Sequence, residues 1–336
     1  MPGDVAWPVL VDACRSMIGR GLDTTSRRPS RQYIQTRFAP ARWSVDRLRY
    51  TYIQRHRSPI PRTKRRMDYT DTSGGITADN RRLLQLLHRG GHTPFTVRDA
   101  AELWGVSAER AGRLLRSLEA GGWLARPRRG LYVPVPLEAA RSGDWHEDPW
   151  VIAAKLFPDG YIGGWSACEH WELTDQVFRE VLVYSARRVA SRDVPLDVGG
   201  IQARKTSSAR LFGLRSVWRG TTKVTVSDPS RTLIDVLDEP ANGGGIRHVT
   251  EIVDAYFRSE HRDDNALIDY GDRFGNRTVF KRLGYVAEAL GLDAAGLVAA
   301  CEARVSRGIS ALDPGIPDRG PIRTKWNLRI NAEVGI

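Results

Sequence analysis

The pattern of hydrophobic and polar positions becomes regular at Ile76 and predicts three short helices. Leucines between positions 83 and 87 give the first helix one apolar face. The second helix begins after Thr96 and the third after Ser107, because a hydroxyl oxygen at these positions can cap a helix. Gly105 supplies the tight turn between them. This order of helix, glycine turn and helix is a helix-turn-helix pattern.

A short hairpin with a basic tip follows the third helix. Residues 123–125 and 131–133 have the composition of two strands, and Arg-Pro-Arg-Arg-Gly at 126–130 predicts the turn between them. A basic hairpin behind a helix-turn-helix is typical of the wing of a winged helix. The sequence therefore predicts a winged helix-turn-helix domain over residues 76–136.

The rest of the chain predicts a linker at 137–149 and a larger mixed α+β domain at 150–336. Strands come first along this domain and helices dominate its later part, which favours an α+β fold. We expect strands near 177–184, 194–203, 214–219, 222–226 and 325–330, and helices at 150–157, 165–171, 229–237, 246–258, 264–272, 276–290 and 294–304.

Charge is distributed unevenly along the chain. The total of +12 divides into +11 for residues 1–66, −2 for 67–76, +5 for 77–136 and −2 for 137–336. Residues 1–75 also lack any sustained helical or strand period, so we expect a basic, disordered tail. The alternative is a basic arm that strengthens nucleic-acid binding.

The predicted third helix and wing offer the residue types that DNA recognition needs. Arginine can bond guanine bidentately in the major groove, and wing arginines can reach phosphates or a minor groove. The candidate nucleic-acid-binding residues are Ser107, Arg110, Arg113, Arg116 and Ser117 on the helix, and Arg126, Arg128 and Arg129 on the wing. The alternative is a winged helix that contacts only other proteins, with these arginines as ordinary solvated surface.

Residues 150–336 carry no sequence signature of a phosphate-binding loop, a zinc protease or a hydrolase nucleophile. The Gly-Gly-Trp-Ser segment at 163–166 resembles the start of a nucleotidyltransferase loop, but no Asp-x-Asp follows it. We expect Glu169 and His170 to be packed rather than catalytic, and Cys168 and Cys301 to be core residues. The sequence therefore predicts a protein without catalytic residues, metal or cofactor.

The cysteine spacing and the hydropathy pattern indicate in which cellular compartment the protein is expected. The three cysteines lie too far apart in sequence for a metal-binding spacing or a disulfide framework, which favours a reducing environment. No stretch approaches the roughly 18–20 apolar residues of a membrane span. We therefore expect a cytoplasmic protein with no membrane partner.

Across residues 77–332 the chain resembles the AbiE-family antitoxins, which are transcriptional regulators of type IV toxin–antitoxin systems. The order of several segments carries this resemblance rather than any one of them. They are the winged-helix pattern at 77–136, YIGGWSA at 161–167, ELTDQ at 172–176, VSDPSRTLID at 226–235, KRLGY at 281–285 and KWNLRIN at 325–331. The basic segment 1–75 departs from the family pattern.

The resemblance implies a function for each predicted domain. It implies that the N-terminal domain binds double-stranded operator DNA at inverted repeats and represses its own operon. It implies that the C-terminal domain opposes a cognate nucleotidyltransferase toxin, functionally or by direct contact. Two alternatives stay open: an enzyme, either a nuclease or a nucleotidyltransferase, targeted by the winged helix, or a stand-alone transcription factor.

Overall fold

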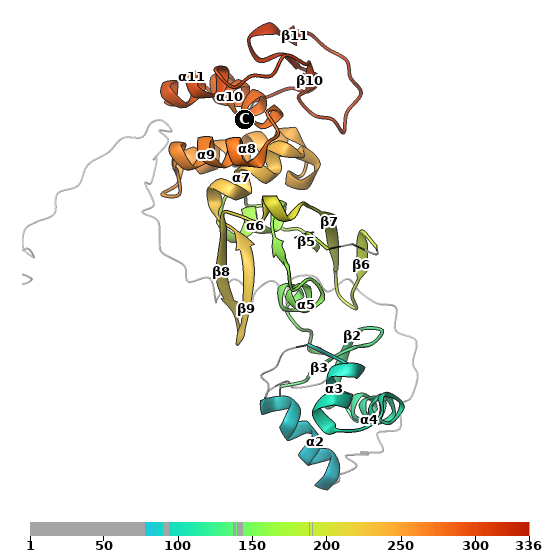
Figure 1. Ribbon diagram of the computed structural model, residues 1–336. Helices are drawn as coiled ribbons and strands as arrows, with labels where there is room; N and C mark the ends of the chain where they lie inside the picture. Colours follow the sequence, from blue (N-terminus) through green and yellow to red (C-terminus); the bar gives the residue numbers. More distant parts are fainter. Residues whose placement is uncertain are drawn as a thin grey trace, which may run out of the picture. The chain divides into compact units, whose positions relative to one another are not determined.

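A computed structural model describes residues 78–89, 94–136, 139, 144–187, 189 and 191–335. The predicted basic tail, residues 1–75, lies outside the described residues. Within the described part, the chain is a mixed α+β protein with ten α-helices and three β-sheets (Figure 1).

The N-terminal module, defined as residues 78–136, packs three helices against a small antiparallel sheet. Its sheet has the order β1-β3-β2. Its core contains Leu84, Leu87, Leu115, Leu118 and Tyr132. The elements are α2 (Ala78–Arg89), β1 (Phe95–Thr96), α3 (Val97–Trp104), α4 (Ala108–Ala120), β2 (Leu124–Arg128) and β3 (Leu131–Pro134).

Local capping fixes where α3 and α4 begin, as the sequence predicts. The Thr96 hydroxyl accepts from the Asp99 N–H, and the Asp99 carboxylate accepts from the Thr96 N–H, which completes a capping box. Gly105 ends α3 in the left-handed conformation, with φ +62°. The Ser107 hydroxyl then accepts from the Arg110 N–H and caps α4.

The hairpin turn is shorter than the sequence predicts. Arg128 pairs with Leu131, so the turn holds only Arg129 and Gly130, and Gly130 provides the positive φ of +83°. Arg126 and Arg128 therefore belong to strand β2 and not to the turn. The pairing register shifts between Ala125 and Arg128, where Pro127 has no N–H to continue the ladder.

The second module, defined as residues 144–335, is built on a mixed six-stranded sheet. The strand order is β6-β7-β5-β4-β9-β8, with parallel pairs β5–β7 and β4–β9. Its first elements are α5 (Pro149–Leu156), β4 (Gly160–Ile162), α6 (Gly164–His170), β5 (Glu180–Ser185), β6 (Asp193–Pro195), β7 (Gly200–Lys205), η2 (Ser208–Arg210), β8 (Leu214–Arg219) and β9 (Thr222–Ser227).

Helices cover both faces of the centre of this sheet. On β5, Val181 and Val183 pack with Ile152 of α5, whereas Leu182 and Tyr184 pack with Trp165 of α6 on the other side. Packing on both faces explains why every residue of β5 after Glu180 is buried. The segment predicted as one strand at 194–203 is two strands, β6 and β7, and the three-residue β4 was not predicted.

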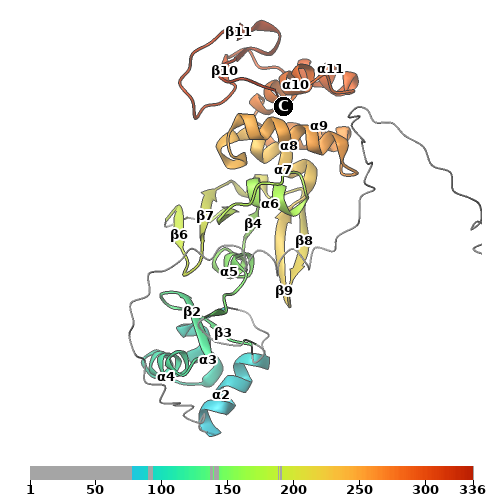
Figure 2. The same cartoon turned by 180° about the vertical axis from the view of Figure 1, so that it is seen from behind.

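Helix α7 (Pro229–Asp238) joins the sheet to a helical layer. Asp228 caps it and Pro229 occupies its first turn, as the sequence predicts. Figures 1 and 2 show α8 to α11 stacked beyond α7, on the side away from the sheet. The later elements are η3 (Pro240–Gly243), α8 (Ile246–Arg258), α9 (Asp264–Phe274), α10 (Thr278–Ala289), α11 (Ala295–Glu302), β10 (Ser310–Ala311), β11 (Ile322–Arg323), η4 (Thr324–Trp326) and β12 (Leu328–Arg329).

The strand predicted at 325–330 is only partly present. Its first residues form the short helix η4, and only β12 is extended. Trp326 accounts for the difference, because its ring is 1% exposed and its Nε1 donates to Glu288 at 2.7 Å. Burial of this ring against α10 therefore outweighs the strand tendency of the segment.

Among the described residues, several contacts join the N-terminal module to the second module besides the chain itself. Leu131 of β3 is 2% exposed and belongs to the hydrophobic cluster that holds Trp150 of α5. Lys155 Nζ lies 2.7 Å from an Asp99 carboxylate oxygen, and the Asp197 N–H donates to the Pro127 carbonyl. The two modules therefore share part of their packing.

Candidate nucleic-acid interface

Helix α4 separates a buried apolar face from an exposed basic face. Ala111, Leu115 and Leu118 lie in the core of the N-terminal module. Five candidate residues are exposed on the other side of the helix or at its N-terminus: Ser107, Arg110, Arg113, Arg116 and Ser117. The apolar stripe thus leaves these polar side chains available to solvent.

The hairpin presents its three arginines unequally. Arg126 and Arg129 are exposed, whereas Arg128 is half-buried. The Arg126 guanidinium carbon lies 5.7 Å from the centre of the Tyr132 ring on the neighbouring strand. Arg129, in the two-residue turn, is the wing candidate that projects from the hairpin end.

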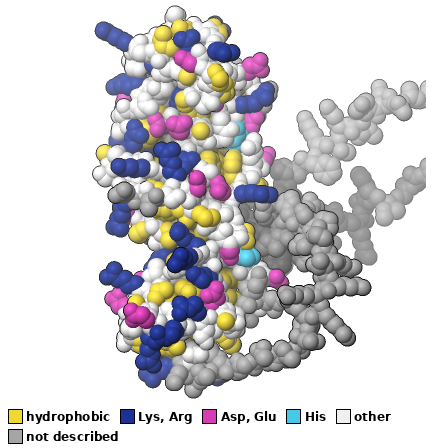
Figure 3. Space-filling view, turned by 90° about the vertical axis from the view of Figure 1, so that its right-hand side faces the viewer, with side chains coloured by type: hydrophobic (Ala, Val, Ile, Leu, Met, Phe, Trp, Pro, Cys, Tyr) yellow, Lys and Arg dark blue, Asp and Glu magenta, His cyan; other side chains and the backbone are white. Residues whose placement is uncertain are grey.

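The arginines of α4 and of the hairpin have no carboxylate partner within 4 Å among the residues that the structure describes. Glu109 lies on the same side of α4, and hydrogen bonds from its own N–H and from the Ser107 hydroxyl lower the pKa of its carboxyl. Figure 3 shows several Lys and Arg side chains on the end of the molecule that carries α2 to α4. The guanidinium groups of α4 and of the hairpin are therefore available to bind an external anion.

The Gly-Gly-Trp-Ser segment of the second module has packing contacts. A Cβ on Gly163 would meet the Tyr184 ring at 2.7 Å, and one on Gly164 would meet the Asn242 carbonyl oxygen at 2.5 Å. The Ser166 hydroxyl is buried and accepts from the Leu182 N–H. These contacts fix α6 against the sheet.

Of the other residues considered for catalysis, His170 is packed, whereas Glu169 is exposed, so the prediction that it is packed is wrong. The His170 ring lies between the rings of Trp150 and Trp171, at 5.3 Å and 4.6 Å between centroids. Partial desolvation by neighbouring groups still raises the pKa of the Glu169 carboxyl. Cys168 and Cys301 are buried free thiols, as predicted. Within the described ranges, no cluster of three His, Cys, Asp or Glu side chains could hold a metal ion, and no helix is long and apolar enough to cross a membrane.

A buried polar network in the second module was not predicted. Arg231 is fully buried in α7, and its Nη1 donates to Asp235 at 2.5 Å. The Tyr161 hydroxyl donates to the same carboxylate at 3.2 Å and accepts from Arg231 Nη2 at 2.8 Å. Burial raises the pKa of Asp235 to about 6. The sequence does contain a signal for this network, because Arg231 and Asp235 are four residues apart within an apolar run.

Comparison with known proteins found a match in the N-terminal module. The family model described as "Transcriptional regulator, AbiEi antitoxin" matches residues 81–135, which span α2 to β3. A search of curated proteins gave no match. Over residues 81–135 the chain is thus similar to the AbiEi antitoxin transcriptional regulators, and the family resemblance predicted from the sequence is confirmed there.

Proposed function

We propose that the N-terminal module is a winged helix that binds double-stranded operator DNA, and that the chain is the autorepressor and antitoxin of a type IV toxin–antitoxin pair. The observation that carries the proposal is the exposed arginine face of α4, within the segment that matches antitoxin regulators. A repressor of this kind works in the cytoplasm.

In this proposal α4 is the recognition helix. Its width suits the major groove, where Arg113 and Arg116 would contact base edges and Arg110, Ser107 and Ser117 would contact base edges or phosphates. The β2–β3 hairpin would lie beside the helix on the backbone. Arg129 and Arg126 would reach phosphates first because they are exposed, and Arg128 would contribute charge from a half-buried position.

DNA binding is tested with the full chain and a labelled duplex taken from upstream of its own gene. We expect saturable binding by fluorescence anisotropy and weaker binding to a scrambled duplex. Arg113→Ala should cost about 1–3 kcal/mol of binding free energy at the operator and relax base preference. Arg307→Ala, an exposed arginine of the second module, is the matched control. Unchanged operator affinity in an Arg113→Ala, Arg116→Ala double variant would remove the basis of the proposal.

The antitoxin role is assigned to the second module. Its charge is near neutral, which makes it a poor binder of duplex DNA but leaves it suited to a protein partner. We expect the full chain with Arg113→Ala and Arg116→Ala to restore growth of cells that express the neighbouring nucleotidyltransferase toxin. If rescue depends on these arginines, antitoxicity acts through DNA binding and the assignment to the second module is wrong. Co-purification of the toxin would indicate direct contact.

A further inference from the structure

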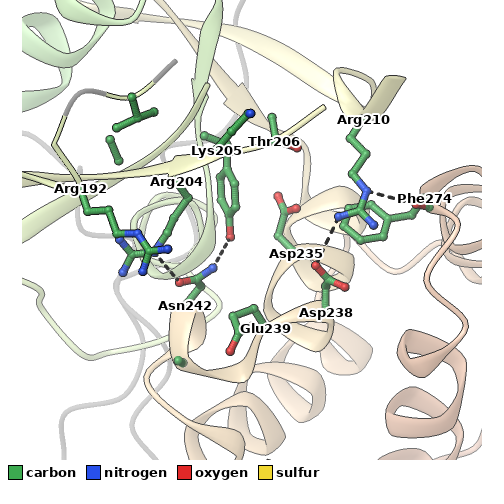
Figure 4. A pocket seen from close by; sticks show the side chains of 14 residues that line it. Arg192, Arg204, Lys205, Thr206, Arg210, Asp235, Asp238, Glu239, Asn242 and Phe274 are labelled. Atoms are coloured by element: carbon green, nitrogen blue, oxygen red, sulfur yellow. Dashed lines mark hydrogen bonds and ion pairs between the residues drawn. The ribbon is translucent and has the colours of Figure 1, made fainter. Parts of the chain in front are cut away.

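A cavity of about 680 Å³ opens in the second module between β7 and the C-terminal end of α7. This volume lies within the range of small-molecule sites in proteins. The cavity is separate from the N-terminal module, and neither the family match nor the proposed DNA contacts involve it. Figure 4 shows polar side chains from both sides pointing into it.

One wall of the cavity is basic. Arg204 of β7 and Arg192, just before β6, lie together on this wall, whereas Lys205, the next residue of β7, lines the rim with its amino group pointing away from them (Figure 4). Among the described residues, none of these three cations has a carboxylate within 4 Å. Cations gathered on one wall without carboxylate partners favour an anion with several acceptor oxygens.

Arg204 is held in place from two sides. Its Nη2 donates to the Gln202 side-chain oxygen at 2.6 Å, and its Nε donates to that of Asn242 at 3.4 Å. Asn242 is itself 4% exposed and donates from Nδ2 to the Tyr184 hydroxyl. These fixed contacts leave the Nη1 group of Arg204 without a hydrogen-bond partner in the described part of the chain, so it can donate to a ligand.

The opposite wall is acidic and partly neutralised. Asp235, at the floor, is paired with buried Arg231, and Asp238 lies 3.6 Å from Arg210. Glu239 lines the cavity and has no cation within 4 Å among the described residues. A carboxylate in this position accepts hydrogen bonds from hydroxyl groups and repels a second anionic group.

We propose that this cavity binds a small phosphate monoester that carries hydroxyl groups, such as a sugar phosphate. The phosphate contacts Arg192 and Arg204, Lys205 adds positive charge at the rim, and the hydroxyl groups donate to Glu239 and Asp238. The two walls together select this class, because a free anion would use only the basic wall and a neutral sugar only the acidic one. The site does not depend on DNA binding.

The test is isothermal titration calorimetry of the full chain with ribose 5-phosphate, ribose and inorganic phosphate. We expect saturable binding of ribose 5-phosphate, with inorganic phosphate weaker and ribose weakest. The double variant Arg192→Glu, Lys205→Glu changes two exposed side chains and should weaken ribose 5-phosphate binding by roughly tenfold or more. Glu239→Ala should reduce the preference for ribose 5-phosphate over inorganic phosphate. Arg307→Glu is the matched control and should leave all three titrations unchanged.

Three outcomes would overturn the proposal. The first is no saturable binding of ribose 5-phosphate by the unchanged chain. The second is equal affinity for inorganic phosphate and ribose 5-phosphate, which would exclude a role for the acidic wall. The third is an unchanged affinity for ribose 5-phosphate in a double variant that circular dichroism shows to be folded. The ligand would then bind at a site other than this cavity.

Discussion

The guanidinium of Arg231 and the carboxylate of Asp235 meet at 2.5 Å, one turn apart in α7, with 0% and 2% of their side chains exposed. Aromatic rings of Phe212 and Phe274 lie 4.9 Å and 4.7 Å from the Arg231 guanidinium carbon. Removing either charge from water is costly, and the pair offsets that cost only while both partners are present. The pair therefore makes α7 sensitive to loss of one partner alone.

We expect Arg231→Met to lower the free energy of unfolding by about 3–5 kcal/mol at neutral pH, because it leaves the Asp235 carboxylate buried without a cation. Urea denaturation of the full chain measures this. The double variant Arg231→Met, Asp235→Leu should recover most of the loss, because no charge then stays buried. Arg262→Met, in the partly exposed pair with Asp264, is the control and should cost less than about 1 kcal/mol. A double variant as unstable as Arg231→Met would contradict the account.

The pKa of Asp235, raised by burial to about 6, gives a pH dependence with a definite sign. The unfolded chain loses this proton near its ordinary value, so the contribution of Asp235 to stability falls as pH rises toward 6 and is constant above it. Removing Arg231 raises this pKa further. The stability of Arg231→Met should therefore continue to fall above pH 6, relative to the unchanged chain, in denaturation series across this range. If the free energies of unfolding of the two chains changed in parallel above pH 6, Arg231 would not be what keeps the Asp235 carboxylate ionised.

The hairpin arginines should act on DNA affinity through charge. Changing Arg128 and Arg129 to Ala together should weaken binding to operator and scrambled duplexes alike, because phosphate contacts carry no sequence information. The slope of log affinity against log salt should flatten by up to about two, since fewer counterions are released. Anisotropy titrations at several salt concentrations measure both quantities. Loss of operator preference with an unchanged slope would instead indicate base contacts from the hairpin.

Leu131 lies in the hydrophobic cluster that joins the two modules, so shortening its side chain should lower the stability of both modules. We expect Leu131→Ala to cost about 2–5 kcal/mol of unfolding free energy, as for other buried leucines. Leu103→Ala is the control, because Leu103 is 49% exposed on α3 and should change stability little. If denaturation of the Leu131→Ala chain matched that of the control, the shared packing would contribute nothing to stability.

Features fixed by neighbouring residues were predictable from the sequence. Thr96 and Ser107 begin α3 and α4 because their hydroxyls bond backbone N–H groups three residues ahead. Asp228 and Pro229 begin α7 for the same local reasons of capping and a fixed φ. The exposed arginine face of α4 follows from helical periodicity once the apolar stripe is buried.

Features that depend on contacts distant in sequence were decided only by the tertiary structure. Strand β5 is buried on both faces because α5 and α6 pack against it from opposite sides. The Arg231–Asp235 pair is predictable as a helical spacing, but its burial depends on Tyr161, 70 residues earlier. The basic wall of the cavity likewise needs the sheet to bring Arg192 and Arg204 opposite α7. Sequence determines local hydrogen bonds and periodicity, whereas burial and charge pairing depend on which elements the whole chain packs together.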